Sequence, residues 1–167
     1  MGGGPVIFVT IGTVFPFDRM IAAMDAFAAT RDDAVIAQIG DGAYEPAHMT
    51  WHRSLPGDLY ARTVADADVI VSHAGMGSAI TALQTGTPLV MVPRRFETGE
   101  HTTDHQMATA RWLESKPGIF IAWNEADLAQ TIAEAEAWGT DGAPLDANAP
   151  AGFTDRLGAQ LRQWTSG

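Results

Sequence analysis

The sequence has 167 residues, a length typical of one domain, and its 46 % hydrophobic and 18 % charged content describes a globular protein rather than a disordered chain. The formal net charge of −10 argues against a nucleic-acid partner, because phosphate backbones are bound by clusters of lysine and arginine. The lack of cysteine excludes disulfides and thiolate metal sites. With no apolar run long enough to span a bilayer and no signal peptide, the sequence favours a cytoplasmic protein.

Apolar, β-rich runs alternate along the chain with segments whose apolar residues recur at helical spacing. In chain order, this pattern predicts a strand at 6–12, a helix at 18–30, strands at 34–40 and 48–55, a helix at 57–67, a strand at 68–73, a helix at 78–86, a strand at 87–93, a helix at 104–115, a strand at 118–123 and a helix at 125–138. The alternation predicts an α/β fold with a doubly wound, mostly parallel, Rossmann-like sheet of about six strands.

The C-terminal part of the chain differs in composition from the rest. Residues 139–152 are rich in Gly, Pro, Ala and Asp, which predicts a linker after a single domain at 1–138. Residues 153–167 then predict a short terminal helix. Its apolar stripe is formed by Phe153, Leu157, Leu161 and Trp164. The stripe could dock a partner or pack back onto the domain, and the sequence leaves both readings open.

Ligands of doubly wound sheets lie outside the carboxyl ends of the strands. The rule places four segments on one rim: Gly12–Thr13, Gly40–Gly42, His73–Ser78 and Pro93–Gln106. Thr13 stands in the first of these turns, where it either reaches a ligand or serves the turn itself. The sequence therefore predicts that a functional site lies on this rim.

The stretch "VIVSHAGMGS" (69–78) breaks from a buried strand into small residues. Gly75 and Gly77 would let a ligand approach the backbone, and the helix expected from Ser78 would direct its free N–H groups at the rim. This combination suits a phosphate or diphosphate, to which His73 could add a hydrogen bond. The alternative is a tight turn in which Ser78 is the N-cap and His73 is satisfied in the core.

A second polar stretch, "EHTTDHQ" (100–106), opens the next rim helix. Thr103 and Gln106 fit a capping box, which needs no ligand. Asp104 and Gln106 in the first turn could instead accept from and donate to sugar hydroxyls. His101 and His105 are four residues apart, a spacing known from metal sites. Since His101 precedes the expected helix, the two imidazoles need not share a face, and we expect no metal site.

Together these stretches resemble a known family. "VIFVTIGTVFPFDRMI", "VIVSHAGMGSAITALQTGTPLVMVPRR" and "EHTTDHQMATARWL" are similar to the C-terminal, donor-binding half of GT-B glycosyltransferases of the family 28 type. The resemblance covers about residues 6–138 and is strongest to the small subunits of split UDP-sugar transferases. These include the soluble subunit of the dolichol-linked GlcNAc transferase and the small subunits of bacterial exopolysaccharide transferases.

The resemblance implies a role for each rim segment. Domain 1–138 would bind a nucleotide sugar, with the donor diphosphate held by Thr13, His73, Gly75, Met76, Gly77 and Ser78. Asp104 and Gln106 would hold the sugar hydroxyls, and His105 stands inside the same D-H-Q pattern. Arg94 and Arg95 would either neutralise phosphate or form a solvated pair. No cofactor is implied, because the UDP-sugar is a substrate.

The implied activity is transfer of a sugar from UDP to a lipid-linked or polysaccharide-precursor acceptor. The residues offer no persuasive general base, and 167 residues leave no room for a separate acceptor domain. We therefore expect a partner, an acceptor-binding subunit attached to the membrane, with this chain peripheral to the membrane through it. Two alternatives stay open: a regulatory module that binds nucleotide sugars without catalysis, and a stand-alone, homo-oligomeric glycosyltransferase. The sequence names neither the sugar nor the acceptor.

Overall fold

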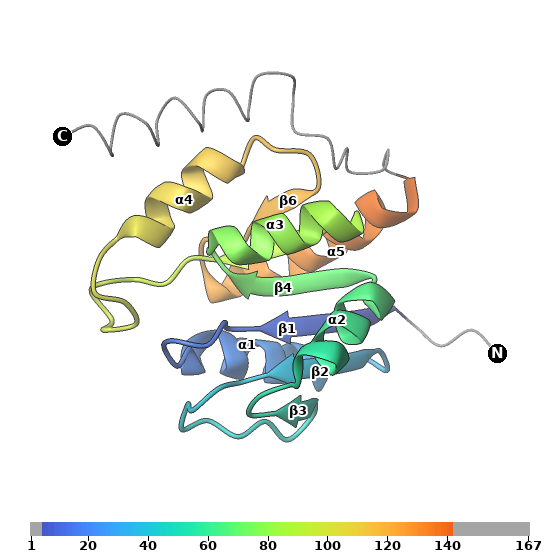
Figure 1. The fold of residues 1–167 in the computed structure, drawn as a ribbon, viewed down its shortest axis with the longest axis horizontal. Helices are drawn as coiled ribbons and strands as arrows, with labels where there is room; N and C mark the ends of the chain where they lie inside the picture. Colours follow the sequence, from blue (N-terminus) through green and yellow to red (C-terminus); the bar gives the residue numbers. More distant parts are fainter. Residues whose placement is uncertain (1–4, 142–167) are drawn as a thin grey trace.

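A computed structural model of the protein describes residues 5–141, in which six parallel strands form one sheet (Figure 1). The strands are β1 (Val6–Thr10), β2 (Ala34–Gln38), β3 (Thr50–His52), β4 (Val69–His73), β5 (Leu89–Val92) and β6 (Ile119–Ile121). The helices are α1 (Asp18–Ala28), α2 (Gly57–Asp66), α3 (Met76–Thr85), α4 (His105–Leu113), the 3₁₀ turn η1 (Glu125–Asp127) and α5 (Leu128–Asp141). This confirms the doubly wound α/β fold.

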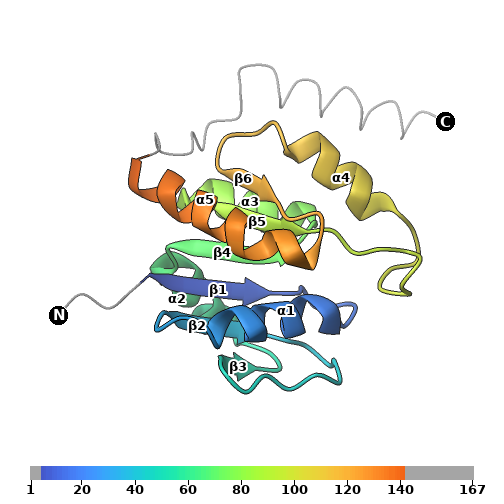
Figure 2. The same cartoon turned by 180° about the vertical axis from the view of Figure 1, so that it is seen from behind.

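The strand order is β3-β2-β1-β4-β5-β6, so the winding reverses between β1 and β4. Helices cover both faces of the sheet. On the face seen in Figure 2, α1 and α5 pack against it through residues such as Met24 and Ile132. On the other face, α2, α3 and α4 contribute Val64, Ala82 and Leu113 (Figure 1). Burial on both sides explains why the strands read as nearly continuous apolar runs.

Two helix starts differ from the expectation. Helix α3 begins at Met76 with Gly75 as N-cap, so Ser78 is not the N-cap. The Ser78 hydroxyl instead lies 2.6 Å from Ser72 Oγ, inside the fold. The capping box at the start of α4 is also wrong, because Asp104 is the N-cap and the Gln106 side chain bonds elsewhere. In both cases a tertiary contact outweighs the local capping pattern.

The end of the described chain corrects one boundary. Helix α5 runs to Asp141, so its last turn includes the first residues of the expected linker 139–152. The rest of that linker and the expected helix 153–167, with its apolar stripe, lie outside the described residues. Within residues 5–141, none of the helices has the length and hydropathy needed for a membrane crossing.

Candidate functional site

The carboxyl ends of β1, β4 and β5 bring three of the expected segments to one rim, on the left in Figure 1. The loop after β1 carries Thr13, which is exposed. The turn after β4 leads into the amino end of α3, and the loop after β5 leads into α4. Since the winding reverses between β1 and β4, this rim is the topological switch point at which such sheets bind ligands.

The amino end of α3 presents a row of backbone donors. The N–H groups of Met76, Gly77 and Ser78 have no acceptor among the described residues, while Ala79 already donates to the Gly75 carbonyl. A Cβ added at Gly77 would meet no atom of the described residues within 4 Å, so the surface beside these donors is open at that position. Free N–H groups at the positive end of the helix dipole suit an anion.

The packing of His73 explains why positions 12 and 75 are glycine, which the sequence alone does not reveal. Its imidazole lies against the backbone of Gly12 and Gly75. A Cβ at Gly12 would come within 2.8 Å of His73 Cε1, and a Cβ at Gly75 would clash with His73 Nε2. Gly12 also has a φ of 75°, which favours glycine. The imidazole therefore leaves no room for a side chain at position 75. No contact within the described residues imposes the same restriction at position 77.

The imidazole of His73 is uncharged at neutral pH. Burial lowers its pKa to about 4, and the positive charge of Arg94 and the nearby His101 act in the same direction. His73 Nδ1 lies 3.2 Å from Ser72 Oγ, which also contacts Ser78 Oγ. His73 can thus serve a ligand as a neutral hydrogen-bonding group and not as a cation.

Arg94 is 2 % exposed, which rules out the solvated pair considered from the sequence. Its Nη2 donates to the carbonyls of Ile11 (2.8 Å) and Phe15 (2.6 Å), and its guanidinium lies 5.0 Å from the centre of the Phe17 ring. Burial lowers its pKa to about 10, so it remains charged at neutral pH. Arg94 therefore anchors the loop that carries Thr13.

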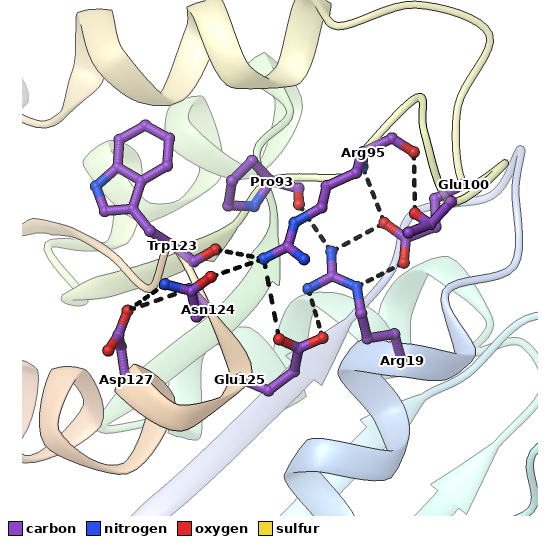
Figure 3. Close-up of polar contacts among 9 residues, drawn as sticks. Arg19, Pro93, Arg95, Glu100, Trp123, Asn124, Glu125 and Asp127 are labelled. Carbon is purple, nitrogen blue, oxygen red and sulfur yellow. Dashed lines mark hydrogen bonds and ion pairs between the residues drawn. The ribbon is translucent and has the colours of Figure 1, made fainter.

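Arg95 belongs to a polar network that the sequence did not reveal (Figure 3). Its Nη2 donates to the Trp123 carbonyl and to Asn124 Oδ1. Its backbone N–H donates to Glu100, which also accepts from Arg19 Nε (2.6 Å) and Nη2 (2.9 Å). Arg19 and Glu100 are 81 residues apart, so no local pattern links them. The network fixes the β5–α4 loop against α1 and η1.

The polar pair at the start of α4 divides into a surface residue and a buried one. Asp104 is exposed, and its Oδ1 accepts from the Phe96 N–H (3.3 Å). Gln106 is 7 % exposed, and its Oε1 accepts from the Arg94 backbone N–H (3.1 Å). Its Nε2 has no acceptor within residues 5–141, which leaves a donor for a ligand. His105 is exposed in the first turn of the helix.

The described residues contain no group of three or more His, Asp or Glu side chains placed to hold a metal ion. His101 Nδ1 is instead engaged with Thr103, whose backbone N–H donates to it at 3.2 Å. The described part of the rim thus presents backbone N–H groups, a neutral imidazole, an amide and the exposed side chains of Thr13 and Asp104.

Residues 6–151 match the model of the glycosyltransferase family 28 C-terminal domain. The chain belongs to this family. A relative of this family 28 domain is the UDP-N-acetylglucosamine transferase subunit ALG13 of Homo sapiens, 30 % identical over 126 residues, which are 68 % of this chain and 11 % of that protein.

Solved glycosyltransferase structures share the fold of this family 28 domain. The kitacinnamycin glycotransferase superposes with a TM-score of 0.64 at 22 % identity, over 87 % of this chain and 37 % of that chain. Os79 from O. sativa, solved in complex with UDP, gives 0.61 at 16 % identity, over 82 % of this chain and 33 % of that chain. The chain spans less than half of each of these three proteins.

Proposed function

We propose that this family 28 domain binds a UDP-sugar at the rim and forms the donor-binding, catalytic part of a glycosyltransferase. The observation that carries the proposal is the row of unpaired N–H groups at Met76, Gly77 and Ser78, at the switch point of the sheet. These groups would hold the donor diphosphate, with Thr13 beside them. The family assignment supports a nucleotide-sugar donor over other phosphate ligands.

The same groups would assist the transfer itself. When the acceptor hydroxyl attacks the anomeric carbon, the bond from this carbon to the diphosphate oxygen breaks and negative charge grows on the departing UDP. Fixed N–H donors and the positive end of α3 stabilise that charge without reorganising. Gln106 Nε2 and Asp104 would hold sugar hydroxyls, and neutral His73 would add a hydrogen bond. We assign no general base, and the UDP-sugar is a substrate, so no cofactor enters.

The acceptor side would come from a partner subunit attached to the membrane, with a lipid-linked sugar as acceptor. Two observations support this part: the human relative is itself named a subunit, and the solved glycosyltransferases extend well beyond the portion matched by this chain. The chain would then work in the cytoplasm at the inner membrane face. A regulatory nucleotide-sugar module and a stand-alone homo-oligomer are separate outcomes of the tests.

Calorimetric titration with UDP, then with UDP-Glc, UDP-GlcNAc, UDP-Gal and UDP-GlcA, tests the donor site. We expect UDP to bind and one sugar to be preferred. Gly77→Val should abolish UDP binding, because a side chain there fits the fold and would crowd a diphosphate bound at the first N–H groups of α3. Thr85→Val, at the exposed other end of α3, is the matched control and should bind like the wild type.

Unchanged UDP affinity in Gly77→Val would remove the diphosphate assignment. Sugar transfer by the purified chain to a soluble acceptor would favour the stand-alone enzyme. Tight binding without turnover, also after a membrane fraction is added, would favour the regulatory module.

A further inference from the structure

An open cavity of about 600 Å³ lies beside α4, and none of the residues that line it belongs to α3. Its walls come from three parts of the chain. The β5–α4 loop contributes Arg95 and Glu97, the helix contributes Met107 and Arg111, and the segment after β6 contributes Trp123 and Asn124. The cavity therefore lies near the carboxyl end of β6, the edge strand of the sheet.

Helix α4 separates this cavity from the candidate donor site. Asp104, Met107 and Arg111 follow helical spacing, so they share the face that lines the cavity. Gln106 projects from the opposite side, where it is buried against the Arg94 backbone. Asp104, at the first turn, lies at the border between the two regions. A ligand in the cavity and a donor sugar held by Gln106 would thus lie on different faces of α4, with Asp104 between them.

The cavity walls are held in place by hydrogen bonds (Figure 3). Arg95 Nη2 donates to the Trp123 carbonyl (2.9 Å) and Asn124 Oδ1 (3.0 Å), and Asn124 Nδ2 donates to Asp127 Oδ2 (3.2 Å). The Trp123 indole points away from the Arg19–Glu100 contacts, and its Nε1 donates to Glu114 Oε1 (3.0 Å). With its N–H satisfied, the indole offers the cavity an apolar ring surface.

The charges around the cavity balance. The formal charges of Arg95 and Arg111 are offset by Glu97 and Asp104, and Arg95 also pairs with Glu125 outside the lining (3.9 Å), so the lining has no excess of positive charge that would select an anion. The side chains of Glu97 and Arg111 make no hydrogen bond or ion pair with another described residue, so their charged groups are free to pair with a ligand. The cavity thus combines an aromatic ring with free hydrogen-bond donors and acceptors. A sugar ring, which has an apolar face and hydroxyl groups around its edge, matches this combination.

We propose that this cavity binds a neutral pyranose, as a second carbohydrate site distinct from the donor site. The inference goes beyond the proposed function, and it holds or fails without any nucleotide. In a glycosyltransferase, such a site would hold a sugar unit of the acceptor or of the growing glycan. A second site of this kind would keep a glycan near the donor between transfers.

NMR of the indole and amide N–H signals tests the site. Methyl glycosides of glucose, N-acetylglucosamine and galactose are added to the full chain, with affinity expected at about the millimolar level for so small a ligand. At least one of them should shift the Trp123 indole signal and the amide signals of Met107 and Ala108. The amides of Met76, Gly77 and Ser78 should stay in place, whereas UDP should move these and leave Trp123 unchanged.

Two variants and one control sharpen the result. Trp123→Ala should abolish the sugar-dependent shifts, and Arg111→Ala, at an exposed position, should weaken the affinity severalfold without affecting the fold. Trp112→Phe, an exposed aromatic position of α4 that does not line the cavity, should leave the affinity unchanged.

Three results would overturn the site. The first is no shift at Trp123, Met107 or Ala108 up to about 100 mM of each sugar, a concentration far above the expected dissociation constant. The second is a shift that persists in Arg111→Ala with unchanged affinity. The third is a response to inorganic phosphate at the same signals with none to the sugars, which would make the cavity an anion site.

Discussion

The Gln106 side chain has two roles, one in the structure and one at the proposed ligand site. Its Oε1 satisfies the Arg94 backbone N–H, and its Nε2 is left for a ligand. Gln106→Ala should lower the free energy of unfolding by about 1–3 kcal/mol, because a buried N–H loses its acceptor. It should also weaken UDP-sugar binding about 2- to 10-fold more than UDP binding, since one neutral hydrogen bond to the sugar disappears. Calorimetry with both ligands and a urea titration give the three numbers.

Equal losses for UDP and UDP-sugar would mean that Gln106 acts by shaping the Arg94 turn and does not touch the sugar. Position 75 shows how such residue-level roles escape sequence reading. Gly75 and Gly77 look alike in "HAGMGS", yet the first accommodates the His73 imidazole and the second faces open space. The difference depends on where a ring packs in three dimensions, which residue spacing does not encode.

Elements far apart in the sequence are held together by the Arg19–Glu100 pair, which links α1 to the β5–α4 loop. Burial alone would raise the pKa of Glu100, but the hydrogen bonds from Arg19 and from the Arg95 N–H hold it below its ordinary value. Because the folded state has the lower pKa, the pair stabilises the protein above the unfolded pKa. That contribution is lost as the pH falls through the folded pKa.

Glu100→Gln should therefore reduce the free energy of unfolding by about 1–3 kcal/mol at pH 7, because Arg19 is left partly buried with a weaker acceptor. The difference from the wild type should vanish once the pH is below the pKa of Glu100 in the folded protein. Denaturant titrations at several pH values measure it. Glu97→Gln in the same loop is the control, because Glu97 forms no ion pair with another residue of the described chain. A difference that persists in acid would contradict the ion-pair account.

At the scale of elements, the sequence predicts the strands and helices well but not their ends. The buried strands are visible because burial on both faces demands apolar runs, as in "VIFVT" and "VIVSH". Strand β3 is shorter than expected: its register with β2 covers Thr50–His52, and a further backbone hydrogen bond joins Gly40 to Arg53. Helix α3 begins two residues before the expected start, and the Ser78 hydroxyl contacts Ser72 instead of capping the helix. Strand pairing and side-chain contacts of this kind depend on the tertiary structure and not on the local sequence.

The topology of the whole molecule follows from the alternation of strands and helices, and it places the site before any side chain is known. The switch point between β1 and β4 gathers the loop that carries Thr13 and the amino ends of the helices that carry Gly77 and Gln106. The alternation cannot predict the buried charged residues that support the rim from behind. Arg94, Arg19 and Glu100 are charged residues with much of their surface buried, and a linear pattern assigns such residues to the surface.

The overall charge of the molecule leads to a prediction about salt. The protein carries a formal net charge of −10, and the proposed ligand UDP is itself an anion. Arg19 and Arg95 are paired with Glu100 and Glu125, and Arg94 is enclosed behind the first loop. If backbone N–H groups hold the diphosphate, added salt screens the long-range repulsion while leaving the short contacts intact.

The dissociation constant of UDP should then change by less than about threefold between roughly 20 and 200 mM NaCl, and any change should be toward tighter binding. The association rate, measured by stopped flow, should rise with salt for the same reason. Uridine, which lacks the diphosphate, controls for effects of salt on the rest of the site. Weakening of UDP by about tenfold or more, with uridine unchanged, would assign the diphosphate to arginine side chains and not to the α3 backbone.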